Sequence, residues 1–310
     1  MKVFVTGATS AVGRALVPNL IKHGHEVIGL ARTTASSAML HAMHAQALLG
    51  QGRDVMALAE AIAGTQAIVH LASSIPTSES ASEDEWRPSP EVTTAMLRYL
   101  VEASARTRVR TCVFVSSPEV YSRENGDAWI TEDSTLAYNR YSQPYLEAED
   151  MLLTQTRGGR VAGIVLRFGL VYGPDLAKTR GLLYALRNGL APLLGNGEIY
   201  WPQLHVQDAA EAIRLALTAT PSGQILNVCD DEPVTQQRLY SDLSRWIGGP
   251  PPVSSTDPYR PRTGGLRLVE LTHSVRMSNA RAKDVLGFYP QYATYREGYT
   301  SVIREVSSIL

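Results

Sequence analysis

The sequence has little of what marks several common classes of protein. It contains two cysteines in 310 residues, Cys112 and Cys229, and both lie in apolar segments without metal-ligand or disulfide spacing. The formal net charge is -1 and no run of lysines and arginines occurs, which argues against nucleic acid or an anionic membrane as a partner. No apolar run reaches the roughly 20 residues that span a bilayer. We therefore expect buried reduced thiols, no metal site and no membrane segment.

The chain opens directly on an apolar pattern, MKVFVTG, that predicts a strand followed by a glycine turn. A signal peptide would instead place a charged segment and an apolar stretch before the fold. We expect a cytoplasmic protein.

Apolar runs and helical patterns alternate through the first two thirds of the sequence. The predicted strands are KVFVTG, EVIGLA, AIVHLAS, TCVFVSS and AGIVLRF, and the predicted helices are GRALVPNLIKHG, VMALAEAIAG, TTAMLRYLVEASART and YLEAEDMLLTQTR. Strands that are apolar on both faces predict an α/β fold with a doubly wound parallel sheet. From about residue 173 loops rich in glycine and proline take over. We expect a sheet domain at 1–172, to which the chain returns around 204–230, and a smaller second region at 173–310.

The segment TGATSAVGRAL follows the first predicted strand and opens a helix. Gly7 and Gly13 flank Ser10 there, and glycines at such a turn let the backbone approach a pyrophosphate, which the helix N-terminus then stabilises. A plain strand-helix turn is the alternative. The second strand ends in Ala31 and Arg32 rather than in an acidic residue. Because an arginine can pair with the 2'-phosphate that NAD lacks, the sequence favours NADP(H), unless Arg32 is simply a solvated side chain.

Seven segments together resemble one known family. They are VTGATSAVG, IVHLAS, VFVSSPEVY, LRFGLVYGP, LHVQDAAEAI, LNVCDDEPVT and MSNARAKDVLGFYP. Their order is similar to that of the extended short-chain dehydrogenases/reductases, the NAD(P)-dependent epimerase/dehydratase group. The resemblance implies a Rossmann domain with a smaller C-terminal substrate-binding region, a bound dinucleotide, a small-molecule substrate and often a homodimer. It also implies the residues along the cofactor: Gly7, Ser10, Ala11, Val12, Gly13, Gln51, Leu71, Ala72 and Ser73. Ser10 replaces the usual middle glycine, and Gln51 stands where the family often has an aspartate.

The resemblance also implies a catalytic hydroxyl, Ser117, a catalytic tyrosine, Tyr141, and a lysine four residues after that tyrosine. The sequence has Tyr145 at the lysine position. A tyrosine with the ordinary pKa near 10 is only about 0.1% ionised at neutral pH, so a nearby cation assists its proton transfer. Arg140 precedes Tyr141 and would point to a different face if both were helical. However, Pro144 predicts that the helix begins after Ser142 as N-cap, which leaves Tyr141 outside it.

Glu119, in SSPEVY, stands where dehydratases of this family carry a proton-abstracting glutamate. It is either a general base for an elimination or isomerisation, or a solvent-facing residue. His205 is expected to be a packing residue. The segments 193–203, with Trp201, and 257–270, with Tyr259, are expected to line the substrate pocket.

Three functions fit these features. The first is an NADP(H)-dependent oxidoreductase or epimerase with a modified active site, acting on a small molecule through Ser117 and Tyr141. The second is a non-redox cyclase, isomerase or dehydratase on the same fold, which would use Glu119, Tyr141 and Tyr145. The third is a dinucleotide-binding protein without catalysis.

Overall fold

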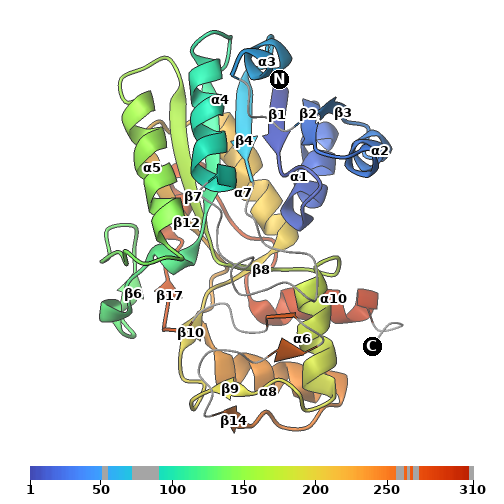
Figure 1. The fold of residues 1–310 in the computed structure, drawn as a ribbon. Helices are drawn as coiled ribbons and strands as arrows, with labels where there is room; N and C mark the ends of the chain where they lie inside the picture. Colours follow the sequence, from blue (N-terminus) through green and yellow to red (C-terminus); the bar gives the residue numbers. More distant parts are fainter. Residues whose placement is uncertain (51–54, 72–90, 256–261, 264–265, 268–271, 307–310) are drawn as a thin grey trace.

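A parallel sheet of seven strands forms the upper part of the molecule in Figure 1. The computed structural model describes residues 1–50, 55–71, 91–255, 262–263, 266–267 and 272–306. The strands of the sheet are β1 Lys2–Thr6, β2 Glu26–Ala31, β3 Gln46–Leu49, β4 Ala67–His70, β5 Thr111–Ser116, β7 Ala162–Phe168 and β12 Gln224–Val228. Their spatial order is β12-β7-β5-β4-β1-β2-β3 and each neighbouring pair is parallel. This confirms the predicted doubly wound α/β sheet, which is of the Rossmann type, and its strand order reverses between β1 and β4.

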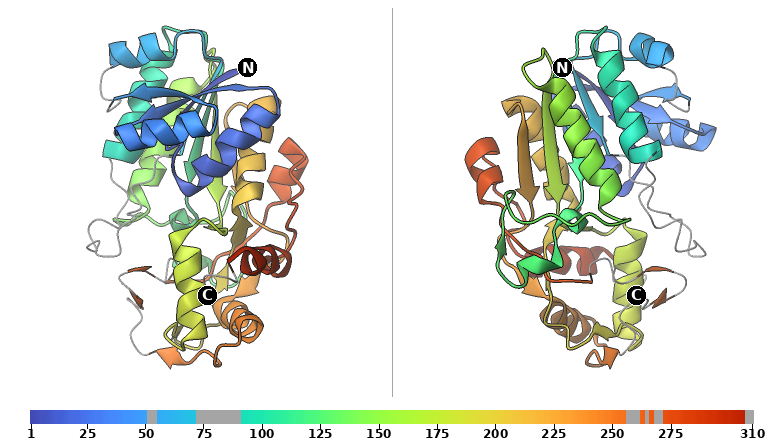
Figure 2. Two further views of the ribbon diagram at one scale, coloured as in Figure 1. Left: turned by 90° about the vertical axis from the view of Figure 1, so that its right-hand side faces the viewer. Right: turned by 60° about the vertical axis from the view of Figure 1, so that its left-hand side comes forward.

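Helices cover both faces of the sheet, as Figure 2 shows from two sides. On one side lie α3 Val55–Ala61, α4 Met96–Ser104 and α5 Gln143–Thr156, and on the other α1 Ala11–Lys22, α2 Thr34–Ala42 and α7 Val206–Ala219. Side chains of a strand alternate between faces. In β5, Cys112 and Phe114 join the first core while Val113 joins the second, and all three are buried. The double burial explains why these strands read as uninterrupted apolar runs.

The five strands predicted from apolar runs are all present in the sheet. The two edge strands, β3 and β12, were not among the predicted strands, and each has only one neighbour in the sheet. An edge strand that is half exposed lacks the continuous apolar signal of the central strands.

Below the sheet, the chain forms helices joined by short strand pairs. These elements are β8 Leu170–Tyr172, α6 Ala177–Arg187, β9 Leu193–Leu194, β10 Tyr200–Trp201, β11 Gln203–His205, β13 Val234–Thr235, α8 Gln236–Ile247, β14 Ser254–Ser255, β15 Arg262–Thr263, β16 Leu266–Arg267, β17 Arg276–Met277 and α10 Tyr295–Val306. The helix α9 Ala280–Leu286 lies beside the sheet instead, packed against α7 and β12. β17 pairs with β6 Trp129–Ile130, which comes from the connection between β5 and α5. Figure 1 shows α6, α8 and α10 on the side to which the parallel strands point.

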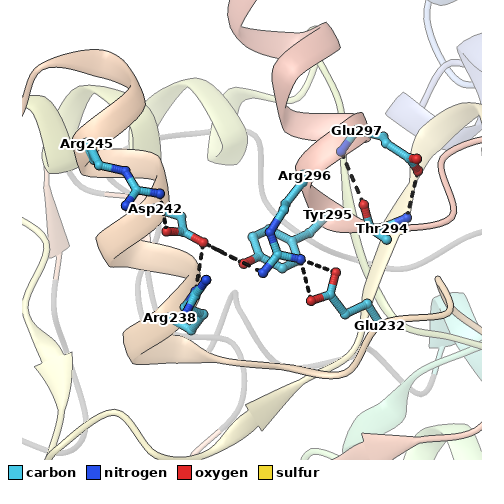
Figure 3. Close-up of polar contacts among 8 residues, drawn as sticks. All are labelled: Glu232, Arg238, Asp242, Arg245, Thr294, Tyr295, Arg296 and Glu297. Atoms are coloured by element: carbon cyan, nitrogen blue, oxygen red, sulfur yellow. Dashed lines mark hydrogen bonds and ion pairs between the residues drawn. The ribbon is translucent and has the colours of Figure 1, made fainter.

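A carboxylate on α8 holds α10 in this lower region (Figure 3). Asp242 accepts hydrogen bonds from Arg238 at 2.9 Å, from Arg245 at 2.7 Å and from the Tyr295 hydroxyl at 2.7 Å. Arg296, which follows Tyr295 in α10, pairs with Glu232. Because the Asp242 carboxylate is buried, these partners replace the water that it loses.

Both cysteines are free and buried, as expected. Burial raises the pKa of the Cys112 thiol to about 12, so this group stays protonated at neutral pH. Among the described residues, none of the helices combines the length and the apolar character that a bilayer crossing needs.

Candidate functional site

The candidate site lies where the parallel strands end. Thr6 of β1 pairs with His70 of β4, and both strands end there, whereas β5, in which Phe114 pairs with His70, continues to Ser116. The strand order reverses between β1 and β4, and a crevice for ligands opens at such a reversal in this class of sheet. The residues that follow β1, β2, β4 and β5 therefore face a common region.

The glycine turn after β1 is built as a tight cradle. Gly7 has a positive φ of 70° and its carbonyl oxygen accepts the Ser10 amide at 2.9 Å. A Cβ at Gly13 would lie 2.4 Å from the carbonyl oxygens of both Gly7 and Ala8, so only glycine fits there. The start of α1 is thereby packed closely against the turn after β1, and the N-terminus of a helix in that place can bind a pyrophosphate.

Ser10 adopts a backbone conformation that does not require glycine. Its φ of -65° and ψ of 170° are ordinary extended values, and its Oγ accepts the Gly13 amide at 3.1 Å. Ser10 is therefore the N-cap of α1, a position that favours serine. The serine that replaces the family's usual middle glycine is thus compatible with the tight turn.

Arg14 is a residue of this turn that the sequence analysis missed. Its guanidinium donates to the Thr9 carbonyl oxygen at 3.0 Å and to the Asp175 carbonyl oxygen at 3.2 Å. It thereby joins the glycine turn to the connection between β8 and α6. Nothing in the local sequence distinguishes Arg14 from any exposed arginine on a first helical turn.

Arg32 is exposed and directly follows β2. The next residue, Thr33, is the N-cap of α2 and accepts the Ser36 amide at 3.1 Å. Arg32 thus stands beside the positive end of a helix dipole, and both features favour an anion.

Of the remaining predicted cofactor residues, Leu71 is buried after β4 and its amide donates to the Thr6 carbonyl oxygen at 3.2 Å. Ala11 and Val12 form the first turn of α1. Gln51, Ala72 and Ser73 lie outside the described residues, as does Tyr259.

Ser117 follows β5 and is half-buried. Its Oγ accepts the Glu119 amide at 3.2 Å and so caps the short 3-10 helix Pro118–Val120. The cap fixes the oxygen of the hydroxyl and leaves its proton available for donation. Glu119 is half-buried in the same turn.

Tyr141 lies in a turn before α5, as predicted from Pro144. The helix begins at Gln143, with Ser142 at the N-cap and Pro144 in the first turn. Asn139 organises the turn, because its Oδ1 accepts the amides of Tyr141 at 2.8 Å and Ser142 at 3.2 Å. Tyr141 is half-buried, and α5 packs beside the 3-10 helix that follows Ser117. Both candidate catalytic hydroxyls therefore belong to the same end of the sheet.

The expectation that Arg140 points away from Tyr141 is wrong. Its Nη2 donates to the Tyr141 hydroxyl at 2.7 Å, and its guanidinium carbon lies 4.8 Å from the centre of the Tyr141 ring. The expectation assumed helical geometry, in which adjacent side chains diverge by about 100°. Both residues lie in the turn instead, where that restriction does not apply.

Tyr145, at the family's lysine position, lies on the buried side of α5. Its side chain is 7% exposed and belongs to the same apolar core as Tyr121 and Leu146. Its amide donates to the Ser142 carbonyl oxygen at 3.0 Å in the first turn of the helix.

Two hydrogen bonds brace the start of α5 against β4. The buried His70 imidazole of β4 donates to the Thr93 carbonyl oxygen at 3.1 Å, and the hydroxyl of the next residue, Thr94, donates to the Pro144 carbonyl oxygen of α5 at 2.9 Å. His70 also contacts the Thr6 hydroxyl of β1 at 2.6 Å. Burial lowers the pKa of His70 to about 4, so the ring is neutral. Because a carbonyl only accepts, Nε2 carries the proton and Nδ1 accepts from Thr6.

A buried ion pair fixes the middle of α5 to the sheet. Arg167 of β7 donates to both carboxylate oxygens of Glu149, at 3.0 and 2.6 Å, and also to the Tyr121 hydroxyl at 3.1 Å. Burial raises the pKa of Tyr121 to about 12, so this phenol remains a donor and bonds Asn227 Oδ1 at 2.6 Å. The sequence analysis missed this network, because residues far apart in the chain form it.

Trp201 and Gln203 line a cavity of about 40 Å³ below the sheet, together with residues of β8, α6, α8 and α10. A cavity of this size is far smaller than a substrate pocket, so the expected role of the segment 193–203 in substrate binding stays a prediction. His205 caps α7, where its Nδ1 accepts the Gln207 amide at 3.3 Å, and packs between Tyr172 and Tyr292. This agrees with its expected structural role.

The fold and the cradle define a Rossmann-type α/β protein. The model of the NAD dependent epimerase/dehydratase family matches residues 3–229, and the chain belongs to that family. The predicted resemblance to extended short-chain dehydrogenases/reductases is thereby confirmed.

Two proteins of similar sequence and one solved structure of similar fold compare with this chain. A 3-diazoavenalumate denitrifying reductase from a Streptomyces species is 28% identical over 310 residues, which cover 96% of this chain and 99% of that protein. A decarboxylating sterol-4-alpha-carboxylate 3-dehydrogenase from Dictyostelium discoideum is 26% identical over 248 residues, covering 77% of this chain and 74% of that protein. The crystal structure of UDP-glucuronic acid 4-epimerase from Bacillus cereus, in complex with UDP-glucuronic acid and NAD, covers 100% of both chains with 19% identity and a TM-score of 0.77.

Proposed function

We propose that this protein is an NADP(H)-dependent reductase that acts on a small organic molecule. The observation that carries the proposal is the cradle at Gly7–Gly13, which has no room for a Cβ at Gly13 and lies where the strand order reverses. The names of two similar proteins, a reductase and a dehydrogenase, support redox chemistry.

The cradle residues would hold the dinucleotide. The backbone amides of Ala11 and Val12 at the start of α1 would face the pyrophosphate, while Gly13, whose amide donates to Ser10 Oγ, would keep the turn tight. Arg32 would pair with the 2'-phosphate, which supports NADP(H) over NAD(H). We infer that the region from residue 173 onward supplies most contacts to the substrate, since it packs below the ends of the strands.

Tyr141 would donate the proton, and Ser117 would orient the substrate atom that receives it. When bound, the reduced nicotinamide supplies a hydride. The Tyr141 hydroxyl would give its proton to the substrate atom that gains negative charge, and the capped Ser117 hydroxyl would orient that atom by a hydrogen bond. Glu119 would serve as a general base only if the reaction is the non-redox alternative.

Turnover measurements with Tyr141→Phe test the redox assignment. A panel of carbonyl and diazo compounds is incubated with NADPH, and substrate loss and loss of nicotinamide absorbance are both followed. We expect stoichiometric NADPH oxidation, and a rate that falls roughly 10²-fold or more in Tyr141→Phe. Tyr138→Phe is the matched control, because Tyr138 lies in the same connection and is 79% exposed. Substrate conversion that persists without any dinucleotide would favour the non-redox alternative with Glu119.

Calorimetric titration with NADPH and NADH tests the role of Arg32. We expect NADPH to bind more tightly, and Arg32→Ala to lose roughly tenfold of that preference, since a hydrogen bond to a charged group contributes about 1.5–3 kcal/mol. Arg98→Ala on the exposed side of α4 should leave both affinities unchanged. Equal binding of the two cofactors by the unmodified protein would rule out the preference.

A further inference from the structure

A nearby positive charge assists proton transfer by a tyrosine such as Tyr141, but α5 has no lysine at the position where the family carries one. The family's lysine position holds Tyr145, a neutral and buried side chain. The described residues nevertheless bring one cation into direct contact with the Tyr141 hydroxyl, the Arg140 guanidinium at 2.7 Å. The same guanidinium also lies over the ring, 4.8 Å from its centre.

The turn that creates this contact is held by other residues. Asn139 Oδ1 accepts the amides of Tyr141 and Ser142, and the Ser142 Oγ accepts the Asn139 amide at 3.0 Å while donating to the Ala137 carbonyl oxygen at 2.5 Å. These bonds fix the backbone without help from the Arg140 side chain. A change at Arg140 is therefore expected to remove the charge and keep the turn.

We propose that Arg140 is a positioning residue that supplies, through Tyr141, the positive charge that the helix lacks. This proposal rests on the proposed function, in which Tyr141 is the proton donor. As the substrate carbon receives the hydride of the reduced dinucleotide, its oxygen takes the proton of Tyr141, and the electron pair of the broken O–H bond stays on the phenol oxygen. The guanidinium stabilises that oxygen as its negative charge forms, and the phenol regains a proton from solvent afterwards.

The proline at 144 and the tyrosine at 145 have a common explanation in this proposal. Pro144 sets the start of α5 after Ser142, so Tyr141 lies outside the helix. Positions 141 and 145 are therefore not neighbours on one helix face, as residues four apart within a helix would be. The charge then comes from the residue next to Tyr141 in the turn. A neutral side chain suffices at position 145, where it packs in the core.

Steady-state kinetics of Arg140→Gln and Arg140→Lys, with NADPH and the substrate found in the screen, test the proposal. Arg140→Gln should lower kcat about tenfold to hundredfold while KM and NADPH affinity stay unchanged, because only the forming charge on the oxygen loses its partner. Arg140→Lys should retain most of kcat, and added guanidinium chloride should restore part of the rate of Arg140→Gln. Arg157→Gln, exposed at the far end of α5, is the matched control.

A readout independent of turnover is the NMR signal of the Tyr141 Cζ atom in protein labelled with ¹³C at that atom of tyrosine. Tyr141→Phe assigns the signal by its disappearance. Arg140→Gln should shift it, because the hydroxyl loses a charged donor, and Arg157→Gln should not.

Two results would overturn the proposal, and only the second would also contradict the proton-donor role of Tyr141. If kcat of Arg140→Gln stays within twofold, or falls equally in Arg140→Lys without guanidinium rescue, Arg140 does not act through its charge. The proposed function still stands in that case, provided that Tyr141→Phe is inactive. If Tyr141→Phe turns over at the unmodified rate, the proton-donor role and the role of Arg140 are both wrong.

Discussion

Tyr145 is the residue at which a family pattern and local packing disagree most. Tyr145→Lys would restore the family's residue, but it would place an ammonium group in a core position that is 7% exposed. We expect this change to lower the free energy of unfolding by roughly 3 kcal/mol, because the ammonium group would lose its water in an apolar core. The measurement is the urea midpoint, and reductase turnover should not rise.

Tyr145→Phe is the control for that prediction, since it keeps the ring and removes only the hydroxyl. Its cost should be at most about 1 kcal/mol, the usual contribution of one hydrogen bond. A Tyr145→Lys variant that is as stable as the unmodified protein and reduces substrate faster would contradict the prediction.

The residues of the site show what sequence reasoning reaches and what it does not. Gly13 and Ser10 were predictable, because a glycine turn before a helix has a fixed local geometry. The contact between Arg140 and Tyr141 was not, because it depends on the rotamers of two side chains in a turn. Arg167 was also missed, since its partners Glu149 and Tyr121 come from other parts of the chain.

At the scale of elements, Asp242 makes α10 dependent on α8. Asp242→Asn would keep the shape of the side chain but weaken the bonds from Arg238, Arg245 and Tyr295, all of which now reach a charged acceptor. We expect a loss of about 2 kcal/mol in the free energy of unfolding, and faster hydrogen exchange in the amides of α10 than in those of the sheet. The measurement is exchange followed by mass spectrometry.

Asp150→Asn is the matched control for the α8 change, because Asp150 is exposed on α5. It should alter neither stability nor exchange. Uniform protection of α10 in Asp242→Asn would show that apolar packing alone, through Tyr299 and Val302, holds that helix.

The elements themselves were predictable where one physical signal dominated. The central strands β1, β4 and β5 are apolar on both faces, and their runs identified them. The short strand pairs below the sheet, such as β8 with β11, have two or three residues each and exist only because distant segments meet. No local pattern marks such pairs in a sequence.

For the whole molecule, two buried histidines predict sensitivity to acid. Burial lowers the pKa of both His70 and His205 to about 4, whereas an unfolded chain titrates histidine near 6.5. The unfolded state therefore takes up protons first as the pH falls. Stability is complete above about pH 6.5 and is lost progressively down to about pH 4, by up to roughly 3 kcal/mol for each ring. Asp208 opposes this loss, because burial raises its pKa to about 6 and the folded state gains that proton earlier.

Urea unfolding between pH 7 and pH 4.5 measures this dependence. His70→Gln should be less stable at pH 7 but should lose less stability on acidification, by up to about 1.4 kcal/mol per pH unit, the value for one proton. His41→Gln, exposed on α2, should keep the slope of the unmodified protein. The same slope in His70→Gln would place the acid sensitivity elsewhere.

The strand β12 has a consequence for how the chain acquires its structure during synthesis. β7 pairs on one side with β5 and on the other with β12, which is made only after β8, α6 and α7. Until the ribosome has released Val228, the hydrogen-bonding edge of β7 has no strand beside it, and until it has released Ala219, α1 lacks the α7 surface against which it packs. An open edge of this kind pairs readily with other chains. The nascent protein therefore depends on delayed completion of its sheet, and a chain that ends near residue 172 would carry an unsatisfied edge rather than an independent folding unit.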